Sequence, residues 1–132
     1  MEMSTSNVKI NIGDKAPDFS LPGVDGKPYS LDSFKGKGIL VMIFMCNHCP
    51  YVQGYLERIK SIQSDYGIKG VQVTGINSND ELNYPDDSFD KMIEMNSLKK
   101  LNFPYLRDED QSVATAYGAQ CTPECFVFDG ER

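Results

Sequence analysis

The sequence predicts an α/β domain in which a central sheet is flanked by helices. Three observations predict this class. Strand and helix patterns alternate along most of the chain, two strands are apolar on both faces, and a cysteine pair lies where the first of these strands turns into a helix. Strands of this kind belong in the centre of a sheet, and parallel neighbours need long crossover connections.

The composition is that of one globular domain. The chain has 132 residues, of which 40% are hydrophobic and 24% charged. We expect residues 1–13 to form a flexible N-terminal segment and residues 14–132 to form the domain. The N-terminus lacks an apolar signal region, so we expect a cytoplasmic protein. A net charge of -6 with scattered basic residues argues against nucleic acid and membrane partners.

The N-terminal part of the domain predicts a hairpin and then a buried strand. Residues 19–21 and 29–31 alternate as short strands around the turn signal Asp25-Gly26. One helical turn is expected at residues 31–34. The apolar run at residues 39–44 has the length of a strand and no polar face, which places it in the middle of the sheet.

The rest of the chain alternates helix and strand. A helix is predicted from Pro50, which suits a first helical turn, to Tyr66. Its apolar stripe comprises Val52, Tyr55, Leu56, Ile59, Ile62 and Tyr66. The later elements are a strand at 71–76, a helix at 89–100, a strand at 104–106, a helix at 111–117 and a strand at 126–128.

Two acidic clusters lie between these elements, at Asp86-Asp87 and Asp108-Glu109-Asp110. Neither has the twelve-residue spacing of a calcium-binding loop. We therefore expect solvated turns and helix N-caps at both places.

The four cysteines form two local pairs, Cys46/Cys49 and Cys121/Cys125. Without a secretion signal, close pairs are more often catalytic or metal-binding than structural. The first pair stands in Cys46-Asn47-His48-Cys49-Pro50, where a disulfide can close across the first helical turn and the helix N-terminus favours a thiolate. We predict that Cys46 is the attacking thiol and Cys49 the resolving thiol.

His48, the single histidine of the chain, is predicted to tune this pair. An imidazolium beside a thiolate stabilises it and makes the disulfide more oxidising. The alternative is an exposed turn residue without effect. For the cysteines themselves, the alternative is a zinc site with four thiolates, although zinc pairs usually lie in glycine-containing turns of small loop-rich modules. We expect no metal and no cofactor.

Several stretches match one known group of proteins: residues 16–21, residues 25–27, the segment from Cys46 to Pro50, and Thr122-Pro123 before a strand. They resemble the thioredoxin superfamily, in the redoxin branch of alkyl hydroperoxide reductase and thiol-specific antioxidant proteins. The resemblance extends from about residue 12 to residue 130. It implies a thioredoxin-like fold with a central mixed sheet, flanking helices and an N-terminal hairpin extension.

The resemblance also implies roles for the second cysteine segment. A cis peptide bond before Pro123 would pack against a Cys46–Cys49 disulfide, and Thr122 and Pro123 would contact the substrate. Cys121, two residues before the proline, is then a candidate third redox thiol. Cys125 falls on the following strand, where we expect a small buried hydrophobic side chain.

The chain departs from the family pattern at two places. Peroxidase members carry a Thr three residues before the attacking cysteine and a Pro four residues before that, where this chain has Ile43 and Ile39. The hydroxyl that orients a peroxide is therefore absent. The family fold also continues after Gly130 with a strand and a helix. Without them, the strand at 126–128 would be an open edge, which favours association into a homo-oligomer.

The sequence thus predicts a thiol–disulfide oxidoreductase that acts in cell redox homeostasis. Its expected partners are protein or small-molecule thiols and disulfides. One alternative is a peroxiredoxin-like thiol peroxidase with antioxidant activity that uses Cys46. The other is a thioredoxin-like binding module or redox sensor without turnover.

Overall fold

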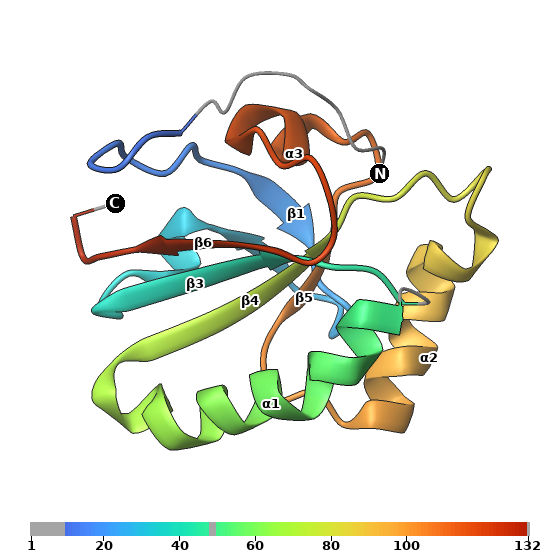
Figure 1. Ribbon diagram of the computed structural model, residues 1–132, viewed down its shortest axis with the longest axis horizontal. Helices are drawn as coiled ribbons and strands as arrows, with labels where there is room; N and C mark the ends of the chain where they lie inside the picture. The colour runs from blue at the N-terminus through green and yellow to red at the C-terminus, as the bar shows by residue number, and fades with distance from the viewer. Residues whose placement is uncertain (1–9, 48–49, 132) are drawn as a thin grey trace.

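The computed structural model describes residues 10–47 and 50–131 of the chain. A four-stranded sheet with the order β5-β4-β3-β6 forms its centre (Figure 1). Neighbouring strands are parallel between β3 and β4 and between β4 and β5, whereas β6 runs antiparallel to β3. The predicted mixed sheet is confirmed. Its strands are β3 (Ile39–Phe44), β4 (Val71–Asn77), β5 (Tyr105–Arg107) and β6 (Glu124–Phe128).

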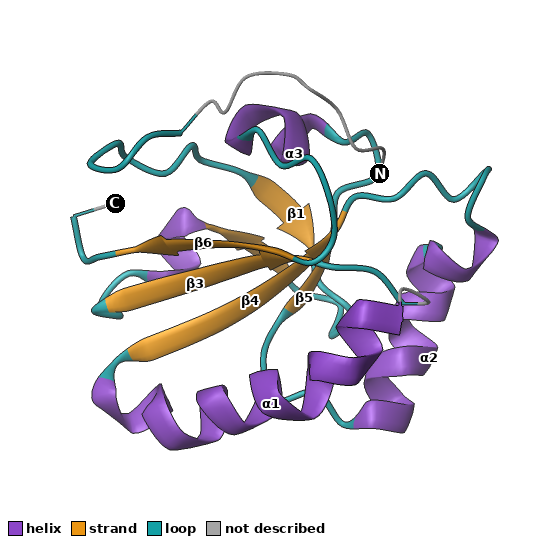
Figure 2. Ribbon diagram, in the orientation of Figure 1, coloured by secondary structure: helices purple, strands orange, loops and turns teal. Residues whose placement is uncertain are grey.

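Helices cover both faces of this sheet (Figure 2). The helices α1 (Pro50–Tyr66) and α2 (Phe89–Lys99) lie on one face, and α3 (Ser112–Tyr117) lies on the other. A separate antiparallel hairpin of β1 (Ser20–Pro22) and β2 (Pro28–Ser30) confirms the predicted N-terminal extension. The described residues also form short 3-10 helices, η1 (Leu31–Phe34), η2 (Gly67–Lys69) and η3 (Pro85–Asp87). None of the helices seen in the described ranges is long and apolar enough to cross a membrane.

The central strand β3 carries core residues on both faces, as its apolar run predicts. Leu40, Met42 and Phe44 belong to the buried cluster on the side of α3 and the hairpin. Ile43 and the following Met45 belong to the cluster on the side of α1 and α2. Successive side chains of a strand point to opposite faces, so one apolar run supplies two cores.

Helix α1 buries a narrower stripe than its sequence predicts. Leu56 and Ile59 reach the core and are 2% and 7% exposed. Tyr55, Ile62 and Tyr66, which belong to the predicted stripe, are 43–47% exposed. The periodicity identifies the inward side of the helix, but the width of the buried stripe depends on the surface against which α1 packs, which is chiefly β4.

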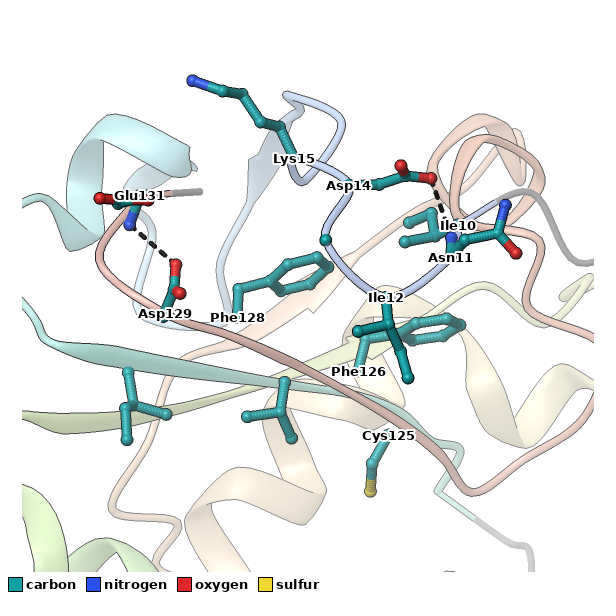
Figure 3. A pocket seen from close by; sticks show the side chains of 13 residues that line it. Ile10, Asn11, Ile12, Asp14, Lys15, Cys125, Phe126, Phe128, Asp129 and Glu131 are labelled. Atoms are coloured by element: carbon teal, nitrogen blue, oxygen red, sulfur yellow. Dashed lines mark hydrogen bonds between the residues drawn. The ribbon is translucent and has the colours of Figure 1, made fainter.

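Strand β6 forms the outer edge of the sheet and has β3 as its single neighbour in the described sheet. Phe126 and Phe128 pack against the ring of Tyr117 from α3. A hollow lies between β6 and residues 10–15, with Ile12, Phe126 and Phe128 on its wall (Figure 3). The predicted edge strand is therefore present.

The expectation of a buried Cys125 is wrong, because this residue is exposed. It alternates with Phe126 and Phe128, so it points to the opposite face of β6. Val127, two residues further along the strand, shares that face and is 66% exposed. The helices on that side pack beside β4 and β5 and leave the outer strand uncovered.

Candidate active site

Cys46 lies two residues beyond the end of β3 and is 1% exposed. The backbone N–H of Met45 donates to the carbonyl oxygen of Ile76 at 2.8 Å, which continues the β3–β4 pairing up to the cysteine. Helix α1 begins four residues later, at Pro50. The predicted position at a strand–helix boundary is confirmed for Cys46. His48 and Cys49 lie outside the described residues.

Thr122 approaches Cys46 from a loop far along the chain. Its hydroxyl donates to the Sγ atom of Cys46 at 3.8 Å, across a separation of 76 residues. The peptide bond between Thr122 and Pro123 is cis, as the resemblance implies. The fold therefore brings two of the residue sets singled out in the sequence to one point, at the carboxyl end of the central strand.

Cys121 lies next to a carboxylate. Oε1 of Glu124 accepts the backbone N–H of Gln120 at 2.8 Å and that of Cys121 at 3.3 Å, and the Cys121 thiol donates to it at 4.0 Å. Burial and the negative charge of Glu124 raise the pKa of the Cys121 thiol. At neutral pH this cysteine is therefore mainly a thiol, which is a weaker nucleophile than a thiolate.

Asp87 is the largest correction to the sequence interpretation of the site. It was expected in a solvated turn or cap, but it is fully buried. Its Oδ1 accepts the backbone N–H of Asn47 at 2.6 Å and Nδ2 of Asn77 at 3.0 Å, and its Oδ2 accepts Nδ2 of Asn79 at 2.9 Å. The reason is η3, which turns the carboxylate inward between two loops and supplies it with donors.

Tyr105 is a second residue that the sequence did not single out. Its buried hydroxyl donates to Oδ1 of Asn47 at 2.8 Å and accepts Nδ2 of Asn77 at 3.1 Å. One sequence signal could have identified this region: Asn77-Ser78-Asn79 follows a strand without interruption, at the edge where ligands and catalytic groups collect in α/β folds.

Asp108 was predicted to cap a helix and to be solvated, and the first prediction is confirmed whereas the second is wrong. Its carboxylate accepts the backbone N–H groups of Val113 at 3.2 Å and Ala114 at 2.9 Å, which caps the start of α3. It is nevertheless fully buried rather than solvated. The hydroxyl of Ser78, which donates to it at 2.6 Å, accounts for the difference by joining the cap to the end of β4.

Within the described ranges, no three His, Cys, Asp or Glu side chains are grouped in a way that could hold a metal ion. The described part of the site places the buried Cys46 sulfur beside the Thr122 hydroxyl and a hydrogen-bonded polar network. Of these features, the hydroxyl donor and the nearby start of α1 favour a thiolate at Cys46.

Comparisons with known proteins agree with this geometry. A proposed peroxiredoxin of Mycobacterium tuberculosis is 30% identical over 115 residues, which cover 87% of this chain and 68% of that protein. The thiol-disulfide oxidoreductase ResA of Geobacillus thermodenitrificans is 27% identical over 127 residues, or 95% of this chain and 67% of ResA. The chain thus spans about two thirds of the length of these relatives.

Solved structures show the same architecture. A hypothetical protein from Sinorhizobium meliloti superposes with a TM-score of 0.90 at 39% identity, over 93% of this chain and 67% of that chain. The thioredoxin domain of a Bacteroides vulgatus thiol-disulfide oxidoreductase superposes with a TM-score of 0.78 at 17% identity, over 92% and 84% of the two chains. The fold is therefore thioredoxin-like. Residues 12–132 match the AhpC/TSA family, and the chain belongs to this family.

Proposed function

We propose that this chain is a thiol–disulfide oxidoreductase in which Cys46 is the attacking thiol and Cys49 the resolving thiol. The observation that carries the proposal is the position of Cys46, 1% exposed at the end of the central strand with the Thr122 hydroxyl 3.8 Å from its sulfur. A start of α1 four residues later supports a stabilised thiolate at this place. The similarity to ResA, named as a thiol-disulfide oxidoreductase, supports the same reaction.

The reaction transfers two electrons from the cysteine pair to a substrate disulfide. The Cys46 thiolate attacks one sulfur of the substrate, so that a mixed disulfide forms and the other substrate sulfur leaves as a thiolate. The Cys49 thiolate then attacks the Cys46 sulfur and releases the second substrate thiolate. The two substrate thiolates take up the two protons that the cysteine thiols lose. An external dithiol reduces the Cys46–Cys49 disulfide again.

The neighbouring residues have supporting roles in this proposal. His48 stabilises the thiolate through its positive charge when it is protonated. Thr122 and Pro123 contact the substrate beside the attacking sulfur, which is supported by the Thr122–Cys46 hydrogen bond. Cys121 is a third redox thiol that exchanges with the pair after Cys46 has reacted. Its raised pKa makes it a poor first nucleophile.

The proposed partners are protein and small-molecule thiols and disulfides. The relatives include a thiol-disulfide oxidoreductase and a proposed peroxiredoxin, and the described part of the site contains sulfur, hydroxyl and amide groups. We also place the protein in the cytoplasm, where such a couple would contribute to redox homeostasis. Fractionation of cells that express a tagged full-length chain checks this location, and recovery in a membrane or secreted fraction would contradict it.

A second copy of the chain is the proposed partner of the β6 edge. The strand has one described neighbour in the sheet, β3. Val127 on β6 is 66% exposed, and Ile39 on β3 is 41% exposed. Unpaired strand edges favour the addition of another strand. Light scattering should show a dimer that a Val127→Lys substitution dissociates. A monomer at all concentrations would rule this association out.

A thiol peroxidase that uses Cys46, with antioxidant activity, is the second candidate. The similarity to a proposed peroxiredoxin favours it. Against it, the position three residues before Cys46 holds the buried Ile43 rather than a hydroxyl side chain. A third candidate is a binding module or redox sensor without turnover.

Reduction of insulin disulfides by the chain with a dithiol as the electron source tests the first proposal. We expect turnover that a Cys46→Ser substitution abolishes. Peroxide consumption that requires Cys46, without insulin reduction, would replace the first candidate by the second. If the wild-type chain shows neither activity, the third candidate, a binding module or redox sensor, remains.

A further inference from the structure

Asn47, the first residue between the two cysteines of the motif, is held at three points. Its backbone N–H donates to Oδ1 of Asp87 at 2.6 Å, and its Nδ2 donates to the carbonyl oxygen of Asp86 at 2.7 Å. Tyr105 donates its hydroxyl to Oδ1 of Asn47 at 2.8 Å. Because Asn47 is only 8% exposed, these bonds form largely away from bulk water. They fix the peptide unit that follows Cys46 in one orientation.

Asp87 carries the negative charge of this arrangement. It lies 40 residues along the chain from Asn47 and is fully buried. Besides Asn47, its carboxylate accepts from Nδ2 of Asn77 at 3.0 Å and from Nδ2 of Asn79 at 2.9 Å. These three groups are N–H donors, which matches a carboxylate because its ionised form can only accept hydrogen bonds.

The pKa of Tyr105 responds to the charged groups near it, Asp87 and Cys46 among them. Burial raises the pKa of Tyr105 well above its usual value, and the negative charges of Asp87 and Cys46 raise it further. The hydrogen bond from Asn77 and the positive charge of Arg107 act in the opposite direction. Tyr105 therefore stays protonated and remains a donor to Asn47. Among the described residues, the charged groups that act on Tyr105 are Asp87 from η3, Arg107 from β5 and the Cys46 sulfur.

We propose that Asp87 is a positioning residue for Cys46 that makes the Cys46–Cys49 couple more reducing; this inference rests on the oxidoreductase function proposed above. Two effects act in the same direction. A negative charge near a thiol disfavours its thiolate. The backbone N–H of Asn47 donates to Asp87, so Asp87 competes with the Cys46 sulfur for this donor. Since a stabilised thiolate makes a dithiol couple more oxidising, a destabilised one makes the dithiol a stronger reductant.

Asp87→Asn tests the proposal because it removes the charge and keeps the size of the side chain. The pKa of the Cys46 thiol is measured from the pH dependence of its alkylation rate, with the Cys46 peptide followed by mass spectrometry. The equilibrium constant of the couple is measured against glutathione. We expect the thiol pKa to fall by about one unit. The equilibrium should shift about tenfold towards the dithiol, which is about 30 mV for a two-electron couple.

Asp108→Asn is the matched control. Asp108 is also fully buried at this edge of the sheet, and its carboxylate accepts from Ser78, Val113 and Ala114, none of which belongs to the Asn47 arrangement. It should cost comparable stability and leave the thiol pKa and the equilibrium constant unchanged. Equal shifts in both variants, or none in Asp87→Asn, would overturn the proposal.

A measurement on the wild-type chain covers the case in which Asp87→Asn does not fold. Because coupling between two sites is reciprocal, the carboxyl ¹³C resonance of Asp87 should change with pH at the midpoint at which Cys46 titrates. The Asp108 resonance should not. An Asp87 resonance indifferent to Cys46 would overturn the proposal. None of these measurements needs turnover, so their failure is distinguishable from a failure of insulin reduction.

Discussion

Two regions of the molecule hold the same central strand by opposite means. The polar end of the sheet is a buried hydrogen-bonded network of Asn47, Asn77, Asn79, Asp87 and Tyr105. The aromatic cluster, on the other face, comprises Phe44, Tyr117, Phe126 and Phe128. Directed hydrogen bonds in the first region fix the residue next to Cys46, whereas packing of the rings in the second region fixes strand β6.

From this difference we expect some substitutions to change only the stability of the fold and others to change the reactivity of Cys46 as well. Packing energy scales with buried area and tolerates changes of geometry, so losses in the aromatic cluster should appear as losses of stability. A buried polar group that loses its partner costs free energy and also releases the groups that it oriented. Substitutions at the polar end should therefore change both the stability of the fold and the reactivity of Cys46.

Tyr117→Ala is expected to have the largest effect on stability. The Tyr117 ring is fully buried and lies 5.8 to 5.9 Å, between ring centroids, from its three aromatic neighbours. Removing a buried aromatic side chain costs about 4 kcal/mol through lost transfer energy and the cavity left behind. Urea unfolding measures the loss of unfolding free energy. The alkylation rate of Cys46 in the remaining folded protein should stay within about twofold of the wild type.

Tyr117→Phe separates the ring from its hydroxyl, which donates to the carbonyl oxygen of Pro17 at 2.6 Å. It should cost about 1 kcal/mol, the value of one hydrogen bond. A loss as large as that of Tyr117→Ala would show that the hydroxyl, and not the packing of the ring, holds this region. The contrast between the two regions would then fail.

Asn77→Ala is the corresponding change at the polar end and should cost about 2 kcal/mol. The substitution removes the donor to Asp87 Oδ1 and to the Tyr105 hydroxyl, and the acceptor of the Asn79 backbone N–H. Unlike Tyr117→Ala, it should also change the pH dependence of Cys46 alkylation, because the Asp87 carboxylate loses one of the donors that hold it. An unchanged alkylation profile with the same loss of stability would make Asn77 a purely structural residue.

The central strand was predictable and the buried aspartate was not, for one physical reason. An apolar run such as residues 39–44 predicts a buried strand without reference to any other part of the chain, and β3 comprises those residues. A carboxylate is buried only when donors surround it, and the donors of Asp87 include Asn47, which is 40 residues distant. A local pattern therefore assigns Asp87 to the surface. The prediction of a buried Cys125 was wrong for a related reason, since the exposure of this residue depends on which layer covers the outer strand.

Cys121, in the second cysteine segment, offers a further test through the pH dependence of its reactivity. Burial and the charge of Glu124 raise the pKa of Cys121. Its alkylation rate should therefore be low at neutral pH and rise about tenfold per pH unit until the pH reaches the raised pKa, as the thiolate forms. Glu124→Gln should move this rise to lower pH, because it removes the negative charge. Mass spectrometry of the Cys121 peptide measures both, and equal profiles in the two proteins would exclude Glu124 as the cause.

The raised pKa also fixes the sign of its effect on stability. The folded state favours the protonated Cys121 thiol, so the contribution is present below the pKa of the unfolded chain and is lost as pH rises through the higher pKa of the folded state. The unfolding free energy should therefore fall in alkaline solution. The decrease should be smaller in Cys121→Ser.

Val127→Thr should have the smallest effect on the unfolding free energy, because Val127 belongs to neither region. Val127 is 66% exposed on β6, so a hydroxyl in place of a methyl group meets water and costs at most about 0.5 kcal/mol. Val73→Thr on β4 is the matched control, since Val73 is 1% exposed and lies within the cluster on the side of α1 and α2. There a hydroxyl is buried among apolar side chains, and the cost should be about 2 kcal/mol. Urea unfolding at low protein concentration compares the two variants. A cost at Val127 equal to that at Val73 would mean that this face of β6 is covered in solution and would contradict the exposure of Val127.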